Sequence, residues 1–228
     1  MSDYKIIPGY LGELVELRDD SQYPELRNLW WPRYDWNCWK YMHQFRTPPE
    51  FFDELMTHVN GNSVMVQAGG NCGQYVRQFS QRFNTVYTFE PDPINFLCLT
   101  LNCSSNNVIK TQACLGNENK FVSIYRESDA GAIHVVEHQG SIPTVRIDDL
   151  KLPSCDLIQL DIEGYEYFAL LGAQHTIEQY HPLIMLEWCG AWAKRYGTDE
   201  KMRDEFLTNM GYSQILSNGS DIIYKYQP

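Results

Sequence analysis

Four short stretches of the sequence contain glycines or carboxylates that could take part in chemistry. They are the glycine turn after "VMVQA", Glu90 after "TVYTF", the pair Asp161 and Glu163 in "QLDIEG", and Glu187 at the end of "LIMLE". Each stretch follows an apolar run of the length of a buried strand. At the ends of parallel strands, such groups can hold a ligand or accept a proton from it.

The glycine turn is formed by Gly69, Gly70, Asn71 and Gly73. Its glycines would let the backbone approach a ligand closely, and the helix expected after it would offer free N–H groups. The turn has neither the G-x-G-x-x-G of dinucleotide sites nor the G-K-[ST] of a P-loop. It therefore favours a ligand without a pyrophosphate, although a tight connection between strand and helix can use the same glycines for structure alone.

Glu90 lies 21 positions after Gly69, at the end of the next expected strand. An acidic residue about 20 positions beyond the glycines is where a doubly wound nucleotide site binds ribose hydroxyls. The alternative is a solvated carboxylate before the turn at Pro91. S-adenosylmethionine fits the combination because it has a ribose and an adenine but no pyrophosphate.

The remaining candidates are possible proton acceptors. Asp161 and Glu163 are two apart at a strand end, so a side-chain period of two would direct both to the same place. We expect Asp161 to act as a base or substrate anchor, Glu163 either to function there or to cap the next helix, and Glu187 to hold a substrate hydroxyl. His134 is either a general base or a surface histidine. The histidines show no H-x-x-x-H spacing, so no metal site is predicted.

Composition limits the classes of function. The 228 residues carry 18 basic and 29 acidic side chains, a net charge of −11, which disfavours nucleic acid as a partner. The sequence has no apolar run of 18 residues and no basic start followed by an apolar segment, so we expect a cytoplasmic protein that neither spans nor binds a membrane. The seven cysteines are scattered without a C-x-x-C motif, which indicates a reducing compartment.

Beyond residue 50, expected strands alternate with expected helices, which predicts a doubly wound α/β fold with a parallel sheet. We expect a helix that ends at Gly172 in a left-handed conformation, and a closing antiparallel hairpin at the C-terminal edge. The expected helices are "PPEFFDELMTHV", 74–82, "PINFLCLTLNC", "YEYFALLGA" and 198–210. The expected strands are "SVMVQA", "NTVYTFEP", "NVIKTQACLG", "KFVSIYRE", "PTVRIDDL", "CDLIQLDIEG", "HPLIMLEW", "SQILS" and "DIIYKY".

Residues 1–49 are expected to form an appendage or lid, and residues 50–228 the main domain. Residues 29–45 contain four of the six tryptophans, Trp30, Trp31, Trp36 and Trp39. Aromatic side chains at this density require burial or a ligand. The segment is expected either to pack on the main domain or to face a substrate, and a homodimer contact is a further way to cover it.

The stretches "VMVQAGGNCGQYV", "TFEPDPINFLCLTLN", "TQACLGN", "VRIDDL" and "CDLIQLDIEGYEYFALLGAQ…HPLIMLE" occur in an order and spacing that resembles FkbM-type S-adenosylmethionine-dependent methyltransferases. The resemblance covers about residues 63–187. It implies a class I methyltransferase fold, S-adenosylmethionine as cofactor, and methyl transfer to oxygen, often on the hydroxyl of a sugar or another small molecule. The implied cofactor-binding residues are Gln67, Gly69, Gly70, Asn71, Gly73, Glu90, Pro91, Asp92, Asn95, Ala113, Asp161 and Glu163.

The sequence departs from the family pattern at two positions, where Gln67 replaces an acidic residue and Gln159 replaces a lysine. If the two positions are in contact, losing both charges together avoids an unpaired buried charge, and we interpret the site as modified but working. Three alternatives stay open: N-methylation, a non-catalytic binding or assembly module of the same fold, and a nicotinamide-dependent oxidoreductase, which the missing fingerprint disfavours.

Overall fold

The structure, a computed structural model, describes residues 6–7, 14–17, 29–35, 49–127, 130–136 and 140–227. None of the helices in this part of the chain combines the length and the hydropathy that crossing a bilayer requires. Trp36 and Trp39 of the aromatic segment lie outside the described residues.

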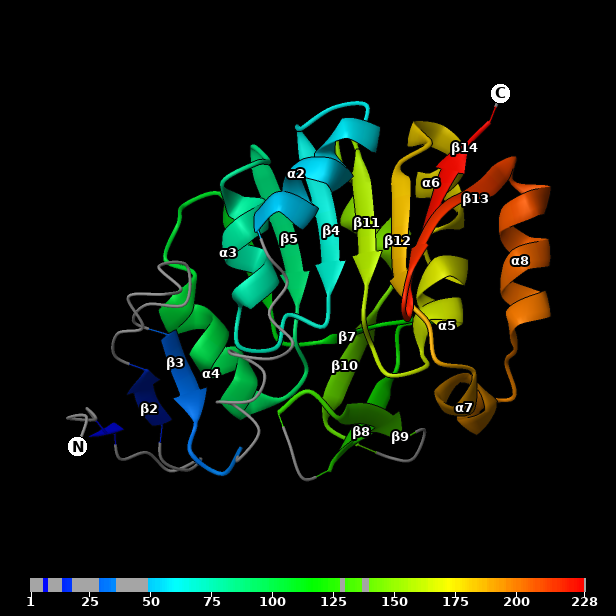
Figure 1. Cartoon of the computed structure of the whole chain (residues 1–228). Coiled ribbons are helices and arrows are strands. Elements are labelled where there is room, and N and C mark those ends of the chain that lie inside the picture. The colour runs from blue at the N-terminus through cyan, green and yellow to red at the C-terminus, as the bar shows by residue number, and fades with distance from the viewer. Residues whose placement is uncertain are drawn as a thin grey trace.

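A mostly parallel sheet of seven strands forms the centre, in the order β13-β14-β12-β11-β4-β5-β6 (Figure 1). Only β14 runs against its neighbours, since it pairs antiparallel with both β12 and β13. The predicted doubly wound class and the antiparallel hairpin at the C-terminal edge are therefore confirmed. The strands are β4 (Val64–Ala68), β5 (Thr85–Phe89), β6 (Val108–Thr111), β11 (Leu157–Leu160), β12 (Leu183–Glu187), β13 (Tyr212–Asn218) and β14 (Asp221–Tyr226).

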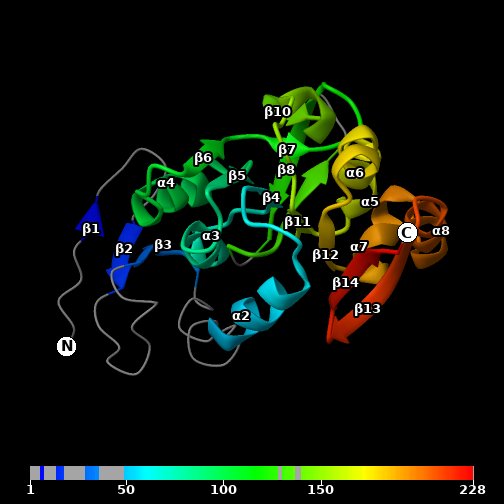
Figure 2. The same cartoon turned by 90° about the horizontal axis from the view of Figure 1, so that it is seen from above.

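Helices cover both faces of this sheet, as Figure 2 shows for α2 and α3 on one side and α5 and α6 on the other. The central strands are apolar at almost every position because both of their faces are buried. The helices are α2 (Pro49–His58), α3 (Gln74–Ser80), α4 (Pro93–Asn102), α5 (Glu166–Leu171), α6 (Gln174–Tyr180), α7 (Gly190–Ala193) and α8 (Glu200–Asn209).

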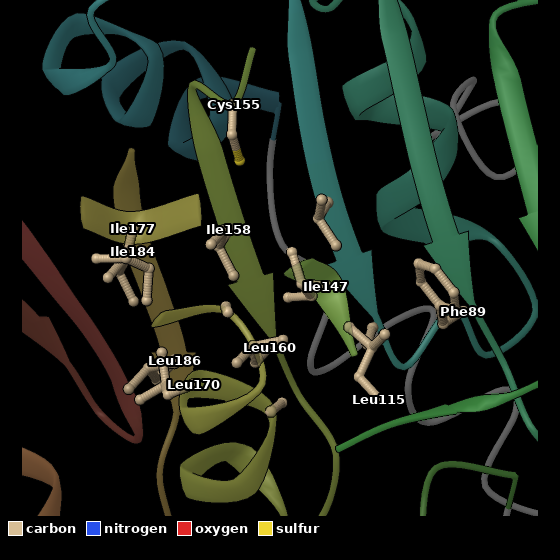
Figure 3. Packing of buried hydrophobic residues seen from close by; sticks show 14 of the residues in the cluster. Phe89, Leu115, Ile147, Cys155, Ile158, Leu160, Leu170, Ile177, Ile184 and Leu186 are labelled. Atoms are coloured by element: carbon tan, nitrogen blue, oxygen red, sulfur yellow. The ribbon is translucent and has the colours of Figure 1, made fainter. Parts of the chain in front are cut away.

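Side chains of alternating strand positions form two separate cores. On one face, Ile158 and Ile184 pack with Ile177 of α6 (Figure 3). On the other, Met65 packs with Phe52 of α2. The two cores hold the strand ends rigidly, which is what a site built on those ends requires.

A second sheet of four strands, in the order β7-β10-β8-β9, lies beyond the carboxyl ends of the central strands (Figure 1). Its strands are β7 (Cys114–Leu115), β8 (Phe121–Arg126), β9 (Ile133–Val136) and β10 (Ile142–Val145). Two of the predicted strands have other bounds in the structure. "NVIKTQACLG" divides into β6 and β7 at a turn in which Ala113 N–H donates to the Thr111 carbonyl (3.1 Å).

"PTVRIDDL" leaves the strand after Val145 and forms the 3₁₀ helix η2 (Ile147–Leu150). The Asp148 carboxylate accepts hydrogen bonds from Thr176 N–H (2.9 Å) and Thr176 Oγ1 (2.8 Å) in α6. This contact holds η2 against the helix rather than in the sheet.

Gly172 corrects another prediction. It follows α5 with φ −76°, a right-handed conformation, so no left-handed cap is formed. A Cβ at this position would lie 2.0 Å from the Gly116 carbonyl oxygen. Position 172 requires glycine because two backbone segments touch there.

At the N-terminal side, β1 (Ile6–Ile7), β2 (Leu14–Leu17) and β3 (Leu29–Pro32) form an antiparallel sheet. The Asn102 side chain at the end of α4 accepts from Trp30 N–H (2.6 Å) and donates to the Trp30 carbonyl (2.8 Å). Leu29 and Trp31 are buried in a small core with Cys98 of α4. The described part of the aromatic segment thus packs on the main domain.

Candidate active site

A cavity of about 970 Å³ opens at the carboxyl ends of the central strands, where the strand order reverses between β4 and β11. This is the position at which open α/β sheets bind ligands. All four chemically interesting stretches contribute to its wall. The predicted site residues on the wall are Gln67, Gly69, Gly70, Asn71, Glu90, Pro91, Asn95, Ala113, His134, Asp161, Glu163 and Glu187.

Two predicted cofactor residues, Gly73 and Asp92, are not on this wall. Gly73 has φ +90°, and a Cβ there would lie 2.6 Å from Cys103 Sγ, so this glycine closes the turn into α3. Asp92 is fully buried, accepts from Ile94 N–H (2.9 Å) at the start of α4, and forms an ion pair with Arg126. Both residues hold the loops that form the wall without lining the cavity themselves.

Gly69 and Gly70 bring the turn into backbone contact with its surroundings. A Cβ at Gly69 would lie 2.5 Å from the Asp161 carbonyl oxygen, and one at Gly70 would lie 2.8 Å from Thr88 Oγ1. Gly70 N–H donates to the Phe89 carbonyl (2.8 Å), which holds the turn against the end of β5. No larger residue fits either position without moving the neighbouring backbone or side chain.

Glu90 connects the turn to the next helix. Its Oε2 accepts from Asn71 N–H (2.7 Å), and its Oε1 accepts from Asp92 N–H (2.8 Å). Only 4% of the residue is exposed. Burial raises the pKa of Glu90 to about 8, although both backbone donors act in the opposite direction.

Gln67 belongs to a row of polar side chains that crosses the central strands. Its Nε2 donates to the Gly69 carbonyl (2.7 Å), and its Oε1 accepts from Thr88 Oγ1 (2.5 Å). Gln159 is its direct register partner in β11, so the two positions are adjacent, as the interpretation of a paired loss of charge requires. Gln159 is also buried, and its Oε1 has no hydrogen-bond partner among the described residues.

The Gln67 amide donates one hydrogen bond and accepts another, which explains why a glutamine fits this position. A carboxylate would have no donor for the Gly69 carbonyl and would place a charge beside that oxygen. The turn is therefore held by an uncharged side chain suited to its present partners.

Asp161 follows β11 and Glu187 ends the adjacent strand β12, so that the two carboxyls lie close enough to interact. Burial and the neighbouring Glu187 raise the pKa of Asp161 well above its ordinary range. Glu187 also accepts from Ser220 Oγ (2.9 Å) in the closing hairpin. Burial raises the pKa of Asp221, which faces Glu187 across β12 and β14, to about 6. Asp161 and Asp221 therefore hold their protons at a higher pH than an ordinary aspartate does.

The prediction that strand periodicity aligns Asp161 with Glu163 was wrong, because β11 ends at Leu160 and Glu163 has φ +59° in a turn. Both still reach the cavity wall. Glu163 does not cap α5 either, since Tyr165 is its N-cap and no side chain caps it.

Glu166 holds this turn instead, and sequence reasoning missed it. Its Oε1 accepts from Ile162 N–H (3.0 Å) and Gly164 N–H (3.1 Å). Burial raises its pKa to about 7. An acidic residue two positions after a glycine, at the start of an expected helix, was the available signal.

His134 lies in β9 and lines the cavity with 12% of its side chain exposed. It is therefore not the surface histidine of the alternative prediction. Its Nδ1 is 3.6 Å from Glu127 Oε1. Burial and Arg195 lower its pKa, against the opposing effect of Glu127.

The sequence did not indicate several other wall residues. Phe51 of α2, Tyr75 of α3 and Asp221 of the hairpin lie on the wall in this way. Trp31 of β3, from the aromatic segment expected either to pack on the main domain or to face a substrate, lies on the wall as well. The lining residues that the structure describes include eight carboxylates and no lysine or arginine. Within these residues, no group of three His, Cys, Asp or Glu side chains has a geometry that could hold a metal ion.

Residues 67–213 match the family model described as the methyltransferase FkbM domain. Among solved structures, a methyltransferase FkbM from Methylobacillus flagellatus aligns with a TM-score of 0.52 and 19% identity, over 78% of this chain and 50% of that one. A precorrin-6y C5,15-methyltransferase from Geobacter metallireducens aligns with a TM-score of 0.50 and 13% identity, over 82% and 92%. These likenesses show the fold. The aligned part is half the length of the Methylobacillus protein, and no curated protein matches the sequence.

The Gln67–Gln159 pair yields a stability prediction. Gln67→Asp removes the donor to Gly69 and buries a carboxylate, so it should lower the free energy of unfolding by about 1–3 kcal/mol. Adding Gln159→Lys gives that carboxylate a cationic register partner, and the double-mutant cycle should show a favourable coupling of about 0.5–3 kcal/mol. Urea unfolding of the wild type, the two single variants and the double variant measures these free energies.

The exposed Gln214→Asp on the edge strand β13 serves as the control and should change the free energy of unfolding by less than about 0.5 kcal/mol. Strict additivity of the two central substitutions would contradict the idea that positions 67 and 159 compensate each other.

Proposed function

Since the chain belongs to the FkbM methyltransferase domain family, a family of S-adenosylmethionine-dependent methyltransferases, we propose that it transfers a methyl group to a hydroxyl of a small acceptor such as a sugar. The observation that carries the proposal is the joint position of the glycine turn and Glu90 on the wall of one cavity. The turn would receive the cofactor, and the far side of the cavity would receive the acceptor.

The cavity suits the cofactor in shape and in charge. Gly69 and Gly70 leave room along the turn that any Cβ would fill, and the volume of about 970 Å³ lies at the upper end of small-molecule sites. Carboxylates without a lysine or arginine among the described lining residues favour a cationic ligand. Glu90 is the group that would accept hydrogen bonds from the ribose hydroxyls.

When bound, the cofactor supplies a methyl group on a positively charged sulfur, which is an activated leaving group. The chain must then align the acceptor oxygen with that carbon and remove the hydroxyl proton. Asp161, whose raised pKa favours its protonated form, and the neighbouring Glu187 would orient the acceptor hydroxyl. The lowered pKa of His134 keeps its imidazole neutral and able to accept a proton near pH 7.

Cofactor binding tests the first half of the proposal. Glu90→Ala should weaken S-adenosylhomocysteine binding by about 2–3 kcal/mol through loss of a charge-assisted contact, and Glu90→Gln should lie between it and the wild type. Titration calorimetry measures the affinities, with NAD as a control ligand and Glu205→Ala, an exposed position in α8, as the control variant. Wild-type protein that binds NAD but not S-adenosylhomocysteine would refute the cofactor assignment.

Methyl transfer tests the second half. With labelled S-adenosylmethionine, wild-type protein should methylate members of a panel of monosaccharides and small alcohols, while matched amines report N-methylation. Asp161→Asn keeps the size of the side chain but removes the carboxyl beside Glu187, and should lower kcat/KM about 10²-fold or more with little change in S-adenosylhomocysteine affinity. Tight cofactor binding without transfer to any acceptor would favour the non-catalytic module.

A further inference from the structure

His134, Glu127 and Arg195 come from three separate elements and meet beside the cavity. His134 lies in β9, Glu127 follows β8, and Arg195 lies in the 3₁₀ helix η3 (Lys194–Tyr196). The same Glu127 oxygen, Oε1, is 3.6 Å from His134 Nδ1 and 3.8 Å from Arg195 Nη2. One carboxylate oxygen is thus shared between an imidazole on the cavity wall and a guanidinium outside it.

Hydrogen bonds fix each of these elements against β9. Glu127 N–H donates to the Ala132 carbonyl (3.1 Å), which holds the end of β8 beside the start of β9. Tyr196 Oη donates to the Val135 carbonyl (2.8 Å), so the neighbour of Arg195 is bound to the neighbour of His134. The Tyr125 ring packs on the His134 ring across β8 and β9, at 5.3 Å between centroids. These contacts hold the backbones of the three elements together, and the 48% exposed Glu127 side chain completes the arrangement.

The orientation of the imidazole gives its two nitrogens different roles. Nδ1 is turned toward Glu127, and Nε2 is on the opposite edge of the ring. A carboxylate beside Nδ1 favours the tautomer that carries its proton there, which leaves Nε2 as the acceptor. Since Nδ1 faces Glu127 and the residue lines the cavity, Nε2 is the nitrogen that would meet a bound hydroxyl.

We infer that His134 Nε2 is the base that accepts the proton of the acceptor hydroxyl, and that Glu127 and Arg195 are the residues that position it. This inference rests on the proposed methyl transfer. The acceptor oxygen forms a bond to the methyl carbon as the carbon–sulfur bond breaks, the electron pair of that bond stays on sulfur, and the hydroxyl proton moves to Nε2. Asp161 and Glu187 then orient the acceptor rather than take its proton.

The charges around His134 predict opposite effects for the two positioning residues. In the described part of the chain, Glu127, Arg195 and the Tyr125 hydroxyl are the titratable or charged groups packed against it. Glu127 stabilises the imidazolium and Arg195 destabilises it. Arg195→Met should therefore raise the pKa of His134, and Glu127→Gln should lower it.

The test compares two readouts of the same titration. NMR of protein with ¹³C-labelled histidine gives the pKa of His134, whose signal is assigned by its loss in His134→Gln. The acid limb of the pH profile of kcat/KM reports the essential base of the free enzyme. Arg195→Met should move both readouts to higher pH, Glu127→Gln should move both to lower pH, and Lys194→Met, an exposed neighbour in η3, should move neither.

Each outcome decides a part of the inference. If the NMR titration shifts while the acid limb stays in place, His134 is not the base. If neither variant shifts the NMR titration, Glu127 and Arg195 do not act on His134. A wild type that binds S-adenosylhomocysteine but methylates nothing would overturn the proposed function and the base together, while the NMR titration would still decide whether the three charges interact.

Discussion

The site depends most on the two backbone hydrogen bonds that Glu90 accepts. One comes from Asn71 in the glycine turn after β4, and the other from Asp92 at the start of α4. A single buried carboxylate thus holds together the loops that follow two adjacent strands. Gly70 can approach Thr88 and Leu99 closely only while this connection holds the turn against β5. The shape of the cofactor side of the cavity follows from it.

Uncharged polar side chains in the central strands also hold the glycine turn in place. Thr88 in β5, Gln67 in β4 and Gln159 in β11 form one row across the sheet. They lie on the face that otherwise packs against apolar residues of α2 and α3. Buried polar groups are costly unless they are hydrogen-bonded, and Gln67 satisfies both ends of its amide. The turn therefore keeps its geometry although the acidic residue of the family pattern is absent. The acidic side chains lie instead on the cavity wall, where they can act on a ligand.

Sequence patterns predicted the sheet and the strand-end residues well because parallel strands that are buried on both faces are continuous apolar runs, and their ends meet at one edge. They failed where contacts distant in sequence decide the conformation. Gly172 is fixed by the Gly116 backbone, and η2 is held by Asp148 against α6. Two other residues act over a short range: Asp92 caps α4, and Glu166 holds a turn that no periodicity describes.

The state of the Glu90 carboxyl provides the most direct test of this account. With its pKa near 8, Glu90 is mostly protonated at pH 7, and ribose hydroxyls that donate to it favour the ionised form. Affinity should therefore fall as the pH drops below that pKa, because the site must lose a proton to bind. Calorimetry of S-adenosylhomocysteine binding at pH 7, in buffers of different ionisation enthalpy, counts the protons released. Wild-type protein should release close to ~1 proton more than Glu90→Gln. Equal proton release by the two proteins would contradict the contact between Glu90 and the cofactor.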